Sequence, residues 1–197
     1  ASRHGARIDV VQGDALRQGF PLIAAVGRAS PRAPRLIDLR LGDDGPRVTL
    51  VGKGVVFDTG GLDIKPSSAM ALMKKDMGGA ASALACADMI MGDMRAGAGP
   101  KIRLRVLLPV VENAVAGEAF RTSEVYRSRK GLTVEVNDTD AKGRLVLADA
   151  LALACEEETE AVISMATLTG AARIAVGPDL APYYTDDEPM AQALEAG

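Results

Sequence analysis

Aromatic and histidine side chains are scarce in this sequence. Aromatic residues make up 3% of its 197 residues, tryptophan is absent, and His4 is the only histidine. A folded core must therefore be aliphatic, built from Val, Leu, Ile, Ala and Met. The two cysteines, Cys86 and Cys155, lie far apart in apolar, helix-like stretches without CxxC spacing. We expect both to be reduced core residues of a cytoplasmic protein.

The sequence also lacks an excess of basic residues and any long apolar run. Its formal net charge is -3, its pI is about 5.3, and its lysines and arginines are scattered. This pattern argues against a nucleic-acid-binding surface, which would gather basic residues on one face. A membrane span needs about 18 consecutive apolar residues, and the N-terminus lacks the order of a signal peptide. We therefore expect a cytoplasmic protein that binds neither nucleic acid nor membrane.

Apolar runs alternate with small-residue helical stretches along the chain, which is 48% hydrophobic. Short aliphatic runs predict strands at 48–52, 102–113, 132–136 and 161–168, and helical spacing predicts helices at 78–94 and 143–158. Strands alternating with helices indicate an α/β fold with a mostly parallel twisted sheet and helices on both faces. The length suits one domain, which we expect to span 1–197.

Three loops carry carboxylates beside lysines and glycines, where open α/β sheets place their sites. They are the loop after the strand at 48–52, the segment before the helix at 78, and the segment "NDTDAKGR" after the strand at 132–136. Taken singly, each loop has an ordinary structural explanation. Asp beside Gly is common turn chemistry, and Lys–Asp pairs are usually solvated. The combination of the three loops therefore carries more information than any one of them.

Several long motifs, in order, resemble the leucine aminopeptidase (cytosol aminopeptidase) family. They are "VGKGVVFDTGGLDIKPSSAMALMKKDMGGAA", "VENAVAGEAFRTSEVYRSRKG", "NDTDAKGRLVLADAL" and "ATLTGAA", and the resemblance runs from about residue 20 to 195. It implies that the chain covers most of the family's catalytic domain, without the separate N-terminal domain and without the domain's C-terminal end. It further implies a cytoplasmic, two-metal aminopeptidase that acts on peptides and assembles as a homohexamer.

The resemblance also assigns roles to individual residues. Implied metal ligands are Lys53 as a neutral amine, Asp58 shared by both ions, Asp76 and Asp140. The implied catalytic residues are Lys65, which would polarise the scissile carbonyl, and Arg144, which would hold a bicarbonate acting as general base; implied substrate-binding residues are Met73, Thr167 and Gly170. Two divalent ions can bind a free α-amine and generate a hydroxide nucleophile near neutral pH. The oxygen-rich ligand set admits Zn²⁺, Mn²⁺ and Mg²⁺.

Lys142 departs from the family signature Asn-Thr-Asp-Ala-Glu-Gly-Arg-Leu, because it stands where the family has a glutamate that bridges both ions. Asp138 replaces the asparagine of the same signature. A lysine in place of glutamate changes the site by two units of charge, which opposes binding of a second ion by several kcal/mol. Four alternatives stay open: Lys142 is a neutral ligand, it turns outward, Asp138 enters the site, or the ammonium group replaces an ion.

Three interpretations of function follow from the resemblance and this departure. The chain is a metal-dependent aminopeptidase with altered or reduced metal use, a non-catalytic relative that acts as a binding or assembly module, or a fragment whose activity needs further segments. A second departure, Ser164 in place of a common family aspartate, is expected to be a lesser loss. Metal content per chain separates the first two interpretations, and particle size tests the third.

Overall fold

The computed structural model describes residues 1–196, which fall into two compact units, 1–167 and from 168 onward. The elements of the first are β1 (Arg7–Gln12), α1 (Gly13–Gly19), α2 (Pro21–Gly27), β2 (Arg35–Leu41), β3 (Arg47–Gly52), β4 (Gly54–Asp58), α3 (Ser67–Met70), the short 3-10 helix η1 (Met73–Lys75), α4 (Gly78–Ala96), β5 (Arg103–Asn113), β6 (Val125–Arg127), β7 (Thr133–Glu135), the 3-10 helix η2 (Thr139–Ala141), α5 (Lys142–Ala154) and β8 (Ala161–Met165). The second contains α6 (Ala171–Val176) and α7 (Glu188–Ala196).

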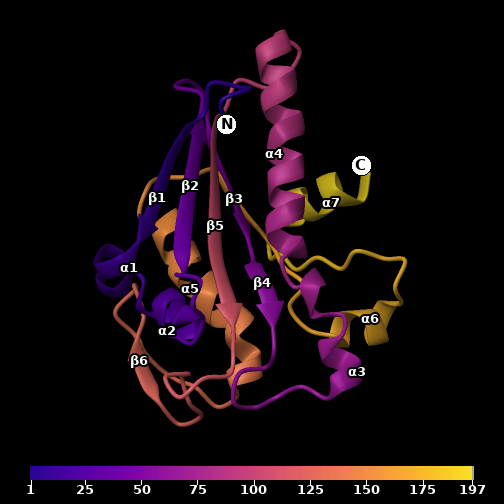
Figure 1. Ribbon diagram of the computed structural model, residues 1–197. Helices are drawn as coiled ribbons and strands as arrows, with labels where there is room; N and C mark the ends of the chain where they lie inside the picture. The colour runs from indigo at the N-terminus through magenta and orange to yellow at the C-terminus, as the bar shows by residue number, and fades with distance from the viewer. Residues whose placement is uncertain (197) are drawn as a thin grey trace. The chain divides into compact units, whose positions relative to one another are not determined.

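A central sheet organises the first unit, with strand order β1-β2-β5-β3-β8 and with β4 paired to the far end of β5 (Figure 1). β3 runs parallel to β5 and β8, and β4 runs parallel to β5. β1 and β2 are antiparallel additions at one edge. The α/β fold with a mostly parallel central sheet is therefore confirmed. β3, β4 and β5 all point their carboxyl ends toward the same end of the sheet.

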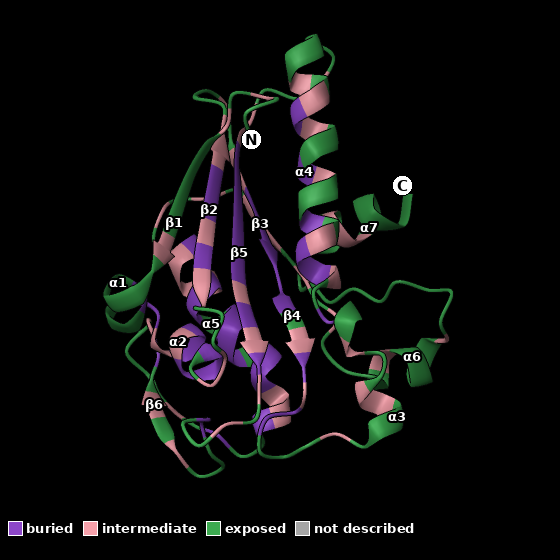
Figure 2. Cartoon of the chain, in the orientation of Figure 1, coloured by how far each residue is buried: buried purple, intermediate pink, exposed green. Residues whose placement is uncertain are grey.

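Helices cover both faces of this sheet with aliphatic side chains, as the sequence predicts. On one face, Leu50 and Val106 pack with Ala83 of α4. On the other face, Val51 packs in a cluster with Val146 of α5 and further residues of α2. Figure 2 shows the buried strands between the helices. Because each fully buried aliphatic side chain contributes about 1.5–3 kcal/mol, these two layers fix the sheet that positions the loops described below.

Two glycines let the start of α4 lie directly against the sheet. A Cβ atom on Gly79 would lie 2.1 Å from the carbonyl oxygen of Met165 at the end of β8. A Cβ atom on Gly52 would lie 2.6 Å from Ala80 Cα. Only residues without a side chain allow this approach. The close packing brings the segment before α4 to the carboxyl ends of β3 and β8.

Some sequence-based expectations are wrong in detail. The strand expected at 132–136 is β7, and it pairs only with β6 in a separate two-stranded sheet, because neither short strand has the apolar length of a central one. The helix expected at 143–158 begins at Lys142 and ends at Ala154. Cys155, expected in the core, follows that helix end and is exposed, whereas Cys86 is half-buried. Within residues 1–196 no helix is long and apolar enough to cross a membrane.

Candidate active site

Residues from three separate loops meet beyond the carboxyl ends of β3, β4 and β5. Asp58 is the last residue of β4, and Lys53 lies between β3 and β4. Asp76 lies between η1 and α4, while Asp140 belongs to η2, directly before α5. The sequence motifs that contain these residues are up to about 90 positions apart, yet their charged ends are within hydrogen-bonding distance of one another. This is the edge of the sheet at which α/β proteins gather ligands.

Asp58 is the fully buried centre of the cluster. Its Oδ1 accepts hydrogen bonds from the Gly60 amide at 2.9 Å and from Asn113 Nδ2 at 2.9 Å. The chain can fold back over the carboxylate because Gly60 has φ +90°, a conformation that residues with side chains rarely adopt. Its Oδ2 faces two lysine ammonium groups, Lys65 at 3.0 Å and Lys142 in a still closer contact. Asp58 is thus held from both sides.

Asp76 and Lys53 form a buried pair beside this centre. Lys53 Nζ donates to Asp76 Oδ1 at 2.7 Å and to the carbonyl oxygen of Thr167 at 2.9 Å, and its side chain is 1% exposed. The Thr167 hydroxyl also donates to Asp76 Oδ1, at 2.9 Å. Asp76 Oδ2 is buried and accepts no hydrogen bond from the described residues. One carboxylate oxygen is therefore tied down and the other faces the interior of the cluster.

Lys65 and Asp140 form the more open side of the cluster. Lys65 Nζ lies 2.7 Å from Asp140 Oδ1 and 2.8 Å from Asp140 Oδ2, so it holds both carboxylate oxygens. The Asp140 side chain is 33% exposed, and that of Lys65 is 12% exposed. Asp138 is exposed, and its Oδ1 caps η2 by accepting a hydrogen bond from the Asp140 backbone amide at 2.7 Å. Asp138 therefore does not enter the cluster.

Lys142 turns inward, to the centre of the three carboxylates. Its side chain is 4% exposed, and its Nζ contacts Asp58 Oδ2, lies 3.2 Å from Asp140 Oδ1 and lies 3.3 Å from Asp76 Oδ2. It also donates to the carbonyl oxygen of Asp140 at 3.1 Å. Nζ thus donates to three acceptor oxygens, which requires the three N–H bonds of an ammonium group. Among the four alternatives left open by the sequence, this geometry agrees with an ammonium group in the place of an ion.

The charges shift the pKa values in directions that follow from these contacts. Burial by itself would raise the pKa of Asp58, but Lys142, the Gly60 amide and Lys65 together lower it to about 2. Burial lowers the pKa of Lys53, although the adjacent Asp76 opposes this. For Lys65, burial is outweighed by Asp140 and Asp58, which raise its pKa. The shifts of Asp58 and Lys65 favour the charged forms of both groups, whereas the burial of Lys53 works against its protonated form.

Carboxylate oxygens suit divalent cations, but this arrangement does not fit a pair of them. Three carboxylates already face three ammonium groups, those of Lys53, Lys65 and Lys142, so the charges cancel without any divalent ion. The Lys142 nitrogen also contacts each carboxylate that would have to coordinate the ions. Across residues 1–196, no group of three or more His, Cys, Asp or Glu side chains is arranged to hold a metal ion.

Three other residues singled out in the sequence lie apart from the charged cluster or outside the first unit. Arg144 is exposed in the first turn of α5, two residues after Lys142. Met73 is half-buried at the start of η1, three residues before Asp76. Gly170 precedes α6 in the second unit, and it is exposed there. The contacts described above therefore join Lys53, Asp58, Lys65, Asp76, Asp140, Lys142 and Thr167, and they do not include these three residues.

Sequence reasoning missed two uncharged residues that organise the cluster. Asn113 ends β5 and donates to Asp58 Oδ1 and to the carbonyl oxygen of Thr139. Thr139 is buried, and its hydroxyl donates to the Gly60 carbonyl at 2.7 Å, which ties η2 to the turn after β4. Both residues lie inside the family motifs quoted from the sequence, Asn113 in "VENAVAGEAFRTSEVYRSRKG" and Thr139 in "NDTDAKGRLVLADAL", and this membership was the signal that could have identified them. The partner of Asn113, Asp58, is 55 residues away in the chain.

Comparisons with known proteins identify the family and the fold of this chain. The model of the cytosol aminopeptidase family, catalytic domain, matches residues 1–197. Peptidase B of Pectobacterium carotovorum subsp. carotovorum is 43% identical over 94% of this chain and 43% of its own length. The crystal structure of cytosol aminopeptidase from Coxiella burnetii has a TM-score of 0.94 and 50% identity, over 100% of this chain and 42% of that one. The bottromycin maturation enzyme BotP in complex with Mn has a TM-score of 0.91 and 39% identity, over 100% of this chain and 43% of that one.

Proposed function

Because the chain belongs to the cytosol aminopeptidase family, we propose that it is part of an aminopeptidase that releases N-terminal residues from peptides, and that Lys142 impairs its use of two divalent ions. The chain spans less than half the length of the relatives named above. One observation carries the proposal, namely that Asp58, Asp76 and Asp140 converge at the sheet edge with the Lys142 ammonium group among them. The same convergence supplies both the site and the reason for its impairment.

The roles that the resemblance gives to single residues are part of this proposal. Lys65 is the most accessible of the three lysines in the cluster, and we assign it to the carbonyl oxygen of the substrate. Arg144 is assigned to a bicarbonate, and Met73, Thr167 and Gly170 to the pocket for the first side chain of the peptide. Lys53, Asp58, Asp76 and Asp140 are assigned as ligands in a state in which Lys142 has left its present position.

A non-catalytic relative is the second candidate, and the ion pairs of Lys142 favour it specifically. A charge-neutral, hydrogen-bonded cluster needs no metal to be stable. Such a chain would keep the family fold and bind peptides or assemble with further copies without hydrolysing anything. The two candidates differ in one measurable respect, because only an enzyme recovers catalysis when divalent ions are supplied.

Peptidase activity and metal content, measured together, test the proposal. Release of leucine from a leucyl chromogenic amide is followed with excess Mn²⁺ or Zn²⁺ for this chain and for Lys142→Glu, and bound metal is counted by mass spectrometry. We expect weak activity for the chain and at least about tenfold more for the variant, about 1.4 kcal/mol of transition-state stabilisation. Equal activity of both proteins would refute the impairment. An inactive variant that nevertheless holds two ions would favour the non-catalytic candidate.

Location, assembly and domain organisation complete the proposal. Relatives named cytosol aminopeptidases support a cytoplasmic location. We further propose that residues 1–197 are most of one catalytic domain and that the protein assembles as a homohexamer. Light scattering of the purified chain tests the assembly, since a monomer near the chain mass of 20.5 kDa would contradict it for this chain.

A further inference from the structure

A second polar site lies at the opposite end of the central strands, where β3 and β5 begin. It is a cavity of about 400 Å³, within the usual size range of small-molecule sites. β3 separates it from the aspartate cluster, because Arg47 is the first residue of that strand and Lys53 follows its last. Five of the residues that line the cavity are arginines: Arg7, Arg40, Arg47, Arg103 and Arg105.

The strand register explains why the arginines gather there. Arg40 of β2 lies directly opposite Arg105 of β5 and also opposite Arg7 of β1. Arg103 of β5 lies directly opposite Arg47 of β3. Residues directly opposite in neighbouring strands share a face of the sheet, so all five emerge on one face. Like charges at such positions are destabilising unless something negative lies between them.

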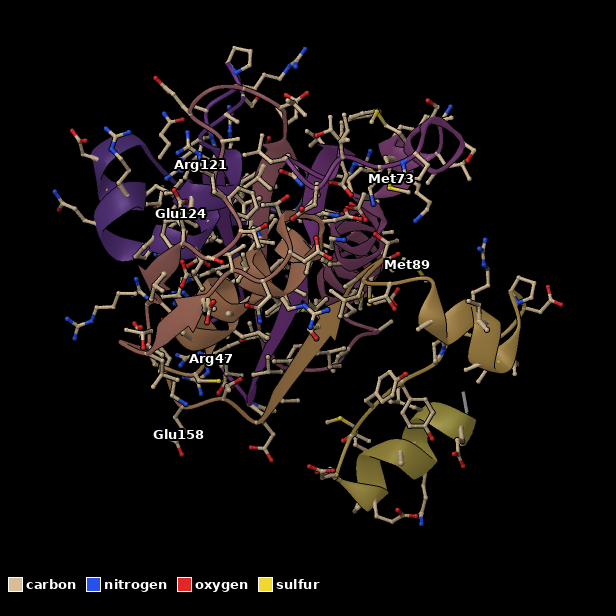
Figure 3. The ribbon with its side chains drawn as sticks, turned by 90° about the horizontal axis from the view of Figure 1, so that it is seen from below. Arg47, Met73, Met89, Arg121, Glu124 and Glu158 are labelled. Carbon is tan, nitrogen blue, oxygen red and sulfur yellow. The ribbon has the colours of Figure 1, made fainter. Side chains whose placement is uncertain are left out.

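Two carboxylates of the chain meet part of this need. Asp38 Oδ2 accepts from Arg105 Nη2 at 2.7 Å, and the Arg105 side chain is only 3% exposed. Glu157, three residues after the end of α5, lies 2.7 Å from Arg40 Nη2 and 3.0 Å from Arg47 Nη1. Figure 3 shows the labelled Arg47 close to Glu158, whose carbonyl oxygen it also binds. These contacts hold three guanidinium groups in fixed orientations.

The remaining two arginines are less fully compensated. Arg103 donates from Nε to the carbonyl oxygen of Gly45 at 2.8 Å, and no ion pair to a carboxylate is found for it within the described residues. Arg7 pairs at 3.0 Å with Asp9, but its side chain is 70% exposed. Asp43 is the single carboxylate among the lining residues of the described chain. Four carboxylates, those of Asp9, Asp38, Asp43 and Glu157, therefore face five guanidinium groups. The site keeps an excess of one positive charge in a chain whose net charge is -3.

We propose that this cavity binds a small molecule carrying a phosphate or diphosphate group. The planar guanidinium fork matches phosphate oxygens in bidentate geometry, and several forks held in place by carboxylates lose little entropy on binding. The cavity is too large for one phosphate alone, so the ligand has an additional uncharged part. This site is independent of the proposed peptidase chemistry, because it shares no residue with the aspartate cluster.

Isothermal titration calorimetry with inorganic pyrophosphate, in buffer without divalent ions, tests the proposal. We expect binding that weakens at least about tenfold, or 1.4 kcal/mol, in Arg103→Gln. Arg103 is chosen because its loss breaks no ion pair with a carboxylate. The matched control is Arg121→Gln, an exposed arginine that Figure 3 places away from Arg47. Asp43→Asn removes a competing negative charge and is expected to tighten binding.

The same titrations contain the outcomes that overturn the proposal. Absence of pyrophosphate binding up to about 10 mM would overturn it, as would equal weakening by Arg103→Gln and Arg121→Gln, which indicates nonspecific attraction. Binding of a polyglutamate peptide without binding of pyrophosphate would assign the surface to an acidic protein segment instead. Asp43→Asn keeps the test valid if Arg103→Gln lowers stability, because it leaves every guanidinium group in place.

Discussion

Replacing Lys142 with glutamate gives the sharpest test of the charge balance at the aspartate cluster. The substitution removes an ammonium group that lies 3.2 Å from Asp140 Oδ1 and 3.3 Å from Asp76 Oδ2, and it adds a fourth carboxylate. At an effective dielectric near 20, two unit charges about 4 Å apart interact by about 4 kcal/mol. Removing one partner of a buried pair costs about 3–5 kcal/mol. We therefore expect Lys142→Glu to lose about 3–5 kcal/mol of folding free energy in chelator.

Thermal unfolding measures this loss and its recovery by metal. A chain of this size shifts its Tm by about 2–4 °C per kcal/mol, so the variant should melt roughly 10 °C below the parent in EDTA. Excess Mn²⁺ or Zn²⁺ should restore it, since a ligand at about one hundred times its Kd adds about 2.7 kcal/mol. The parent should melt at the same temperature in chelator and in metal, because its cluster is already neutral.

Two further variants separate charge from coordination. Lys142→Met removes the ammonium group but adds no carboxylate, so it should lower the Tm with little recovery in metal. Lys75→Glu makes the same charge change at an exposed position and should stay within about 0.5 kcal/mol of the parent. A parent that binds two ions per chain and gains Tm in metal would refute the reasoning, because ions would then displace the Lys142 ammonium group.

Three other predictions concern stability, and each is measured by unfolding in denaturant. Gly79→Ala should lower the free energy of unfolding by about 3 kcal/mol, because its Cβ would lie 2.1 Å from a backbone carbonyl oxygen of β8. Gly92→Ala, in the same helix but with open space around it, should raise that free energy by about 0.5–1 kcal/mol. Equal effects of the two variants would contradict the tight packing of α4. Asp149→Ala should cost about 3 kcal/mol because it leaves three backbone amides of the buried region without an acceptor, and the exposed Asp93→Ala should be near neutral. Burial would raise the pKa of Asp38, but two neighbouring guanidinium groups lower it, so its contribution is present above the unfolded-state pKa near 4 and is lost as pH falls through the lower folded-state pKa. Asp38→Asn should therefore flatten the acid limb of stability against pH, and an unchanged limb would contradict this assignment.

The main sheet was predictable because its central strands are long and aliphatic. The apolar runs at 48–52 and 102–113 predict buried strands. The small residues from Gly78 onward predict a helix that packs closely against the sheet. β7 was not distinguishable from a central strand and β6 was not predicted as a strand, because three-residue strands carry too few apolar positions to indicate which sheet they join. Cys155 was wrongly expected in the core because the sequence did not show that the helix ends one residue before it, which leaves its side chain exposed.

For the aspartate cluster, the sequence identified the residues but not the orientations of their side chains. The motifs named Asp58 and Lys142, but only tertiary structure shows that the Lys142 nitrogen turns toward Asp58 from a position 84 residues away. The arginine-lined cavity was less accessible still. Its contacts join Asp38 to Arg105 across 67 residues, and the arginines appear scattered in the sequence because each strand contributes only one or two of them.

An ammonium group and a divalent ion impose different requirements on the same carboxylates. A divalent ion accepts lone pairs from several directions, so it holds carboxylates together only while it is present. The Lys142 ammonium group is covalently attached to the first turn of α5 and donates three hydrogen bonds in fixed directions. It therefore connects η2, β4 and the start of α5 whenever the chain is folded. If the ammonium group replaces an ion, as we propose, stability at this end of the sheet should not depend on metal supply, and a metal requirement in Lys142→Glu would be the direct sign of that replacement.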